Sequence, residues 1–158
     1  MRKSSYLVLA LLLAAAVAQA GTPLSNAAGK GDLASVKAAL AAGEKINEAD
    51  KWGWTPLLWS VFYEKLPVTL YLLDQGADPN CVAGAKYHRI QAGSTPLIIA
   101  GYYGMTAVVE PLLQHGARPE LTDRLGYRAI DYAKQFQFKE VAALLEPAAP
   151  VQALPASR

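Results

Sequence analysis

Three Thr-Pro pairs recur along the chain, and each is followed at the same interval by a glycine. The matching positions are Thr22 with Gly43, Thr55 with Gly76, and Thr95 with Gly116. The interval from glycine to the next unit is also equal for Gly43 to Thr55 and for Gly116 to Arg128, but it is longer for Gly76 to Thr95. This spacing predicts a stack of equivalent units, with an insertion in one connecting loop.

Each unit carries signals for two helices. Proline fits the first turn of a helix, because its missing N–H needs no partner there, and glycine suits the left-handed position just past a helix end. The period of about 33 residues and the segments TPLLWSV, YLLDQGADPN, TPLIIAG and PLLQHGARPE resemble the ankyrin repeat. The resemblance implies an all-α solenoid of about four helix-turn-helix units with short β-turn finger loops. We expect the domain over residues 21–146, with units near 22–54, 55–94, 95–127 and 128–146.

The segment at residues 1–20 has the pattern of a secretory signal peptide. Arg2 and Lys3 precede a charge-free apolar run from Leu7 to Ala18, and the small residues of AQA offer a cleavage site before Gly21. The run is shorter than the roughly 20 apolar residues that span a bilayer. We therefore expect export to a bacterial periplasm and no stable membrane insertion, with an uncleaved anchor as the alternative.

Removal of this segment would take away Arg2 and Lys3, leaving 13 basic and 13 acidic residues from totals of 15 and 13. No basic cluster remains, so the charge pattern argues against a nucleic-acid partner. Cys81 is the single cysteine and has no partner for an internal disulfide. We expect it to be buried, with an intermolecular disulfide as the alternative.

Apolar residues at helical spacing predict which side chains form the core. In the first unit these residues are Leu33, Val36, Ala39 and Leu40, and in the second they are Trp59, Leu70, Leu72 and Leu73. Two segments depart from the pattern. Pro111 falls inside the helix expected at 106–114, where it should bend the helix. Residues 147–158 are rich in Pro and Ala, and we expect them to be a disordered tail.

The family resemblance implies that binding residues lie in the turn before each Thr-Pro pair and at the end of the first helix, on the concave side. Eight of the chain's 14 aromatic residues fall at such positions. Rigid rings provide large contact area at low entropic cost, so this density favours a protein-binding surface. As an alternative, some rings pack against neighbouring turns and stiffen the stack. The predicted binding residues are Trp52, Trp54, Phe62, Tyr63, Tyr87, His88, Arg89, Tyr102, Tyr103, Arg124, Tyr127 and Phe136.

Three of these residues, Tyr87, His88 and Arg89, belong to the inserted loop at 81–94. We expect this loop to project from the same edge as the turns. Long loops without structure of their own are uncommon in compact domains and are often functional. A tolerated insertion is the alternative.

No catalytic, cofactor or metal site is predicted. His88 and His115 lack an accompanying cysteine pair, and phosphate-binding glycine loops and hydrolase motifs are absent from the sequence. Asp50 and Asp123 stand in the related segments DKWG and DRLG, where hydrogen bonding within a turn explains them better than acid-base chemistry.

We therefore expect an exported ankyrin-repeat protein, not an enzyme, that binds another protein. The first hypothesis is an immunity or inhibitor protein that blocks a toxin or hydrolase. The second is an accessory protein that supports a periplasmic enzyme, because exported bacterial proteins that resemble this one include helpers of catalases in peroxide defence. A haem or small-ligand carrier using Tyr87, His88 and His115 is a third.

The signal-peptide hypothesis predicts a mature protein that begins at Gly21 and is released by osmotic shock, because the short apolar run favours cleavage over anchoring. N-terminal sequencing of the released protein measures this. An intact N-terminus recovered from washed membranes would contradict it.

Overall fold

The computed structural model describes residues 22–146, so the predicted signal peptide and the predicted tail lie outside the described residues. The described range contains eight helices and no strand, which confirms the expected all-α solenoid. The helices are α2 (Pro23–Lys30), α3 (Leu33–Ala41), α4 (Pro56–Phe62), α5 (Leu66–Asp74), α6 (Pro96–Tyr103), α7 (Thr106–Gln114), α8 (Ala129–Gln135) and α9 (Lys139–Leu145).

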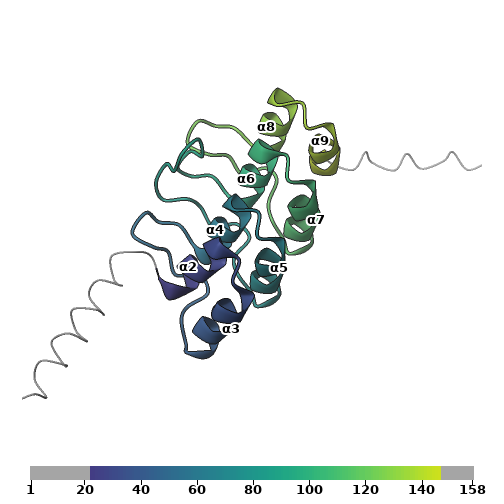
Figure 1. Ribbon diagram of the computed structural model, residues 1–158. Helices are drawn as coiled ribbons and strands as arrows, with labels where there is room; N and C mark the ends of the chain where they lie inside the picture. Colours follow the sequence, from purple (N-terminus) through teal and green to yellow (C-terminus); the bar gives the residue numbers. More distant parts are fainter. Residues whose placement is uncertain (1–21, 147–158) are drawn as a thin grey trace, which may run out of the picture.

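The helices form two parallel rows (Figure 1). We call α2, α4, α6 and α8 the inner row and α3, α5, α7 and α9 the outer row. The long turns that connect one helix pair to the next extend together on the side of the inner row, away from the outer row (Figure 1). Each helix packs against its own partner and against the equivalent helix of the next pair, as in a repeat stack.

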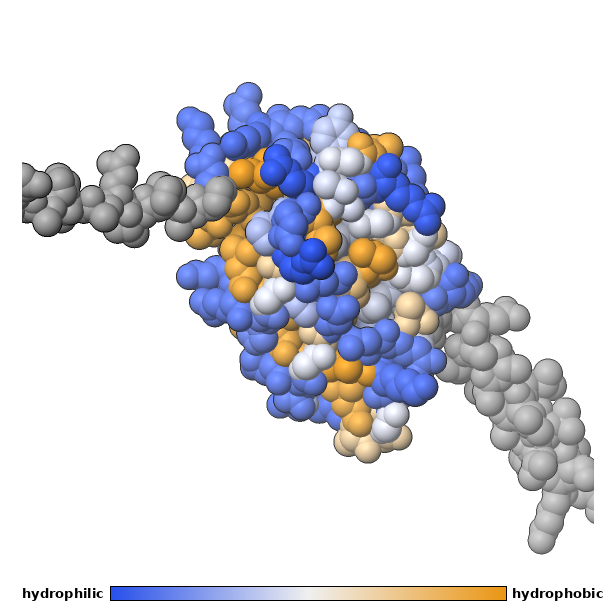
Figure 2. Space-filling model, turned by 180° about the vertical axis from the view of Figure 1, so that it is seen from behind, coloured by the Kyte–Doolittle hydropathy of each residue, from blue (hydrophilic) through white to orange (hydrophobic). Residues whose placement is uncertain are grey.

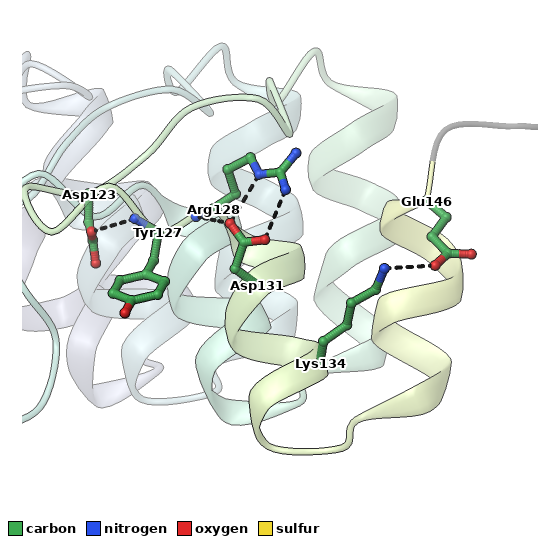
Figure 3. A network of polar contacts seen from close by, with 6 residues as sticks. All are labelled: Asp123, Tyr127, Arg128, Asp131, Lys134 and Glu146. Carbon is green, nitrogen blue, oxygen red and sulfur yellow. Dashed lines mark hydrogen bonds and ion pairs between the residues drawn. The ribbon is translucent and has the colours of Figure 1, made fainter.

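The Thr-Pro pairs start the first three inner helices. The side chains of Thr22, Thr55 and Thr95 accept hydrogen bonds from the backbone N–H groups three residues later, and proline follows directly. The last inner helix lacks this threonine. Its N-cap is Arg128, whose backbone N–H and guanidinium both donate to Asp131, with distances of 2.9 to 3.0 Å (Figure 3). These hydrogen bonds lower the pKa of the Asp131 carboxyl.

Inner-row residues are buried between neighbouring units. In α4, six consecutive residues from Pro56 to Val61 are buried, and Trp59 is among them, as predicted. Val36, Leu72 and Leu73 are also buried, which confirms their assignment to the core. Leu33 is only partly buried against the core, and so are Ala39 and Leu40, so these residues contribute less buried area to it.

Leu70 was assigned to the core from its spacing, and this prediction was wrong. Its side chain is 36% exposed, whereas Leu72 in the same helix is fully buried. Successive residues point about 100° apart around a helix, so only one side of α5 faces its neighbours. Leu70 lies on the exposed side. Pro111 lies inside α7 as expected, and the helix continues to Gln114.

The opposite side of the molecule is seen in Figure 2, where hydrophobic residues form separate patches among hydrophilic ones. This face offers no single continuous apolar area in that view. No helix within residues 22–146 has the length and apolar character needed to cross a bilayer.

Leu72 and Leu70 form a matched pair for testing the stack. Leu72→Ala should lower the free energy of unfolding by about 2 to 5 kcal/mol, because it leaves a cavity between units. Leu70→Ala should cost about 1 kcal/mol or less, since its side chain already contacts water. Urea unfolding followed by circular dichroism measures both values. Equal losses would contradict the observed orientation of α5.

Candidate functional site

The turn before α4 is organised by one carboxylate. Asp50 Oδ1 accepts hydrogen bonds from the backbone N–H groups of Trp52 and Trp54, each at 2.9 Å. The other oxygen, Oδ2, accepts from the indole Nε1 of Trp59 at 2.7 Å. The carboxylate therefore shapes the turn and fixes it to a ring on the inner helix that follows.

The turn before α8 repeats this arrangement. Asp123 Oδ1 accepts from the backbone N–H group of Leu125 at 2.9 Å. It also accepts from that of Tyr127 at 3.1 Å (Figure 3). Its Oδ2 accepts from the hydroxyl of Tyr132 at 2.6 Å. The pKa of Tyr132 is raised, mainly by burial and also by this hydrogen bond. The structure thus places both aspartates in turns, as predicted.

The contact from each turn to its helix was not predicted from sequence. Trp59 and Tyr132 both follow their aspartate by nine residues and both carry an aromatic N–H or O–H donor. This shared spacing is the feature of the sequence from which the contact could have been predicted. Its consequence is that two of the turns are held rigidly against the inner row.

Trp54 was predicted to be partly exposed and available for binding, and this was wrong. Its side chain is fully buried, and its Nε1 donates to the Ala85 carbonyl at 3.1 Å. Its ring packs against those of Trp59, Phe62 and Tyr87, with centroid distances of 4.7 to 5.6 Å. The inserted loop covers it, and the regular repeat spacing contains no such loop at this position.

The inserted loop lies at the same edge as the turns, as expected, and it packs against them. The N–H of Gly84 donates to the Gly53 carbonyl at 2.9 Å, and the Ala92 carbonyl accepts from the N–H of Arg124 at 3.1 Å. The loop therefore bridges the turns on both sides. Near its tip, Ile90 is only 1% exposed and belongs to the core.

The close approach of the loop to the preceding turn requires glycine. A Cβ on Gly53 would lie 2.6 Å from the Cα of Gly84, and Gly53 has a φ of +72°. Both the available space and the backbone conformation exclude a larger residue there. At the tip of the loop, the exposed side chains are Lys86, His88 and Arg89.

Tyr87 joins this loop to the inner row. Its ring lies 4.9 Å from that of Trp59 and 5.3 Å from that of Phe62, centroid to centroid. Its hydroxyl is 3.3 Å from the hydroxyl of Tyr63, and this hydrogen bond raises the pKa of Tyr87. Tyr87, which was predicted to bind a partner, therefore also has a structural role. This agrees with the alternative that some rings pack against neighbouring turns and stiffen the stack.

A second group of rings continues along α6 and α8. Tyr102 contacts Tyr103, Tyr132 and Phe136, with centroid distances of 4.9 to 5.2 Å. The two groups meet where Phe62 and Tyr103 lie 5.9 Å apart. Rings from three successive units therefore form one continuous aromatic surface.

Most of the predicted binding residues keep exposed area on this surface. Phe62, Tyr87, Tyr102 and Tyr103 are half-buried. Those with larger exposure are Trp52, Tyr63, His88, Arg89, Arg124, Tyr127 and Phe136.

Two hollows interrupt the aromatic surface. The smaller, of about 390 Å³, is lined by Ser25, Asn26, Gly29, Lys30, Asp50, Trp52, Trp59, Tyr63 and Tyr87. The larger, of about 630 Å³, is lined by Phe62, Tyr63, His88, Arg89, Tyr102, Tyr103, Phe136 and Phe138. Tyr63 lies between them and lines both.

The structure does not gather the residues of the haem hypothesis. His115 follows α7 in the outer row, with its Nδ1 2.8 Å from the Pro111 carbonyl oxygen and its Nε2 3.3 Å from Asp74. Tyr87 and His88 lie against the inner row instead. Within residues 22–146, no group of three or more potential metal ligands is clustered.

Cys81 lies half-buried at the start of the inserted loop, with its Sγ 3.1 Å from the Thr55 hydroxyl oxygen. Burial raises the pKa of the thiol to about 12, although the hydrogen bond to Thr55 opposes the rise. A thiol with this pKa stays protonated and poorly nucleophilic at neutral pH. The expectation that Cys81 is buried is therefore met in part, because the residue is half-buried.

Trp54 and Trp52 provide a test of the corrected surface. Trp54→Ala should lower the free energy of unfolding by about 3 to 5 kcal/mol, because it empties the space beneath the inserted loop. Trp52→Ala should cost about 1 kcal/mol or less, since that ring is 41% exposed and has one edge-on contact with Trp59. Urea unfolding of both variants provides the comparison. A wild-type midpoint for Trp54→Ala would contradict the burial of this ring.

Comparison with known proteins agrees with the geometry. A family model for ankyrin repeats in three copies matches residues 2–83, and a model for the single ankyrin repeat matches residues 92–124. The putative ankyrin repeat protein YahD of Escherichia coli strain K12 is 32% identical over 126 residues, which cover 79% of this chain and 45% of YahD. The E3 ubiquitin-protein ligase hecd-1 of Caenorhabditis elegans is 33% identical over 119 residues, which cover 73% of this chain and 4% of the ligase.

The chain thus spans less than half the length of these relatives, and the ligase activity named for one of them belongs to a far larger protein. Arrays of ankyrin repeats form extended concave surfaces that serve as protein-interaction modules. The repeat spacing, the two helical rows and both family models lead to one conclusion, that this chain belongs to the ankyrin-repeat family.

Proposed function

We propose that this protein binds another protein through its aromatic surface, as an exported inhibitor of a toxin or hydrolase. The observation that carries the proposal is the continuous run of rings from Trp52 to Phe136 with its two hollows. Binding hot spots are enriched in aromatic residues and lie in pockets that exclude water.

Rigidity of the surface supports tight binding. Asp50 and Asp123 hold two turns against the inner row, and backbone hydrogen bonds hold the inserted loop at both ends. Less backbone entropy of the turns and the loop is then lost on association, so more of the contact free energy contributes to affinity.

A concave surface with hollows suits a protruding segment of a partner. In enzymes, such segments are commonly the loops that carry or surround the active site. A bound repeat stack would then block substrate access, which is the reason for placing inhibition before the accessory role. The proposed periplasmic compartment rests on the composition of residues 1–20.

Two half-buried tyrosines in different rows separate binding from stability. Tyr103 lies on the aromatic surface at the end of α6, whereas Tyr71 lies in the outer-row helix α5 beside Lys37. Tyr103→Ala should weaken capture of the partner from periplasmic extract by about 2 kcal/mol or more. Tyr71→Ala should leave capture unchanged, and melting curves of both variants control for folding.

Equal capture by wild type and Tyr103→Ala would exclude this surface as the binding site. The activity of the captured partner then tests the role. A loss of activity on adding the purified repeat protein is expected. A gain would instead identify an accessory protein.

A further inference from the structure

The larger hollow has an uneven charge distribution. The segment at 81–94, which forms one of its sides, contains Lys86 and Arg89 and no acidic residue. Arg89 lines the hollow and is near Tyr103. Burial raises the pKa of Tyr103, with a further rise from Tyr102, and the charge of Arg89 acts in the opposite direction.

Arg124 adds positive charge next to this loop. Its backbone N–H is bonded to the Ala92 carbonyl, and the space beside Gly93 is occupied by Arg124 Cγ. Both Arg89 and Arg124 are exposed, and neither forms an ion pair with another residue in the range 22–146.

Nearby carboxylates do not balance these charges. Asp123 is buried, and its two oxygens accept three hydrogen bonds, from Leu125, Tyr127 and Tyr132. No carboxylate is among the described residues that line the larger hollow. Glu64 follows Tyr63 in the sequence but does not line the larger hollow.

The other carboxylates are ion-paired, belong to outer-row helices or lie in loops, and none of them lines the larger hollow; those in loops are Asp32, Glu44, Glu48, Asp50 and Asp78. Asp131 is paired with Arg128, and Glu146 is paired with Lys134 at 3.0 Å (Figure 3). Asp74, Glu110 and Glu140 belong to outer-row helices. The larger hollow is therefore lined by aromatic rings, His88 and Arg89 with no carboxylate, and Arg124 lies next to the loop that forms one of its sides.

We propose that the larger hollow binds an acidic segment of a partner protein, which inserts an aromatic side chain between Phe62, Tyr102 and Phe136 and places its carboxylates against Arg89 and Arg124. This inference rests on the proposed function and specifies the chemistry of the partner. The inserted ring supplies most of the affinity, because it is removed from water. The exposed arginines contribute mainly to selection of the partner and to the rate of association.

The probes are four synthetic peptides of equal length. Three carry one central phenylalanine flanked by glutamates, by glutamines or by lysines, and the fourth has alanine at the centre of the glutamate peptide. Fluorescence anisotropy at low and at physiological salt measures each Kd. The glutamate peptide with phenylalanine should bind about tenfold more tightly than the glutamine or alanine peptide. Its advantage over the glutamine peptide should shrink as salt rises, because ions screen exposed charges.

A charge-reversed variant and a matched control locate the site. Arg89→Glu combined with Arg124→Glu should abolish the preference for glutamate and favour the lysine peptide. Lys37→Glu combined with Lys45→Glu changes the net charge equally, but at α3 and the turn after it, and should preserve the preference. Melting curves confirm that each variant is folded.

Absence of binding by the glutamate peptide, or equal binding of the glutamate and lysine peptides, would overturn the proposal. Capture of the natural partner separates this failure from failure of the proposed function. If Tyr103→Ala lowers capture and the Arg89 and Arg124 reversals do not, the aromatic surface is the binding site but its partner is not acidic there. If neither lowers capture, both proposals fail.

Discussion

Burial of the inner helices between neighbouring units is the constraint on which the rest of the structure depends. α4 has a pair of helices on each side, and six of its seven residues are buried. α3 lies at the beginning of the described stack and buries only Val36 completely. A single helix pair cannot bury its own apolar face, so each unit is stabilised mainly by the units next to it.

The candidate binding surface follows from the same packing. Because the inner row is fixed between units, rings at its helix ends are held beside each other at centroid distances of 4.9 to 5.9 Å. The turn carboxylates then connect the turns to that row through Trp59 and Tyr132. Core packing and surface shape are therefore coupled, and a change at Asp50 or Asp123 would affect both.

The inserted loop gives this array its particular character. It covers Trp54, places Ile90 in the core and adds two basic side chains with no acidic neighbour within the loop. A regular repeat would leave the face of Trp54 open and would lack the wall that Tyr87, His88 and Arg89 provide. The loop thus covers one ring and contributes His88 and Arg89 to the lining of the larger hollow.

Sequence alone determined the repeat period, the helix starts at Thr-Pro, the role of the two turn aspartates and most of the aromatic surface, because all of these depend on local spacing. It misassigned Leu70 and Trp54, and it did not predict how the inserted loop packs against the turns. Whether a side chain is buried depends on which other parts of the chain pack against it. Trp54, for example, contacts Ala85, which is 31 residues away in the sequence. Local periodicity carries no information about such a distant contact, so only the tertiary structure decided which rings are core and which remain available for binding.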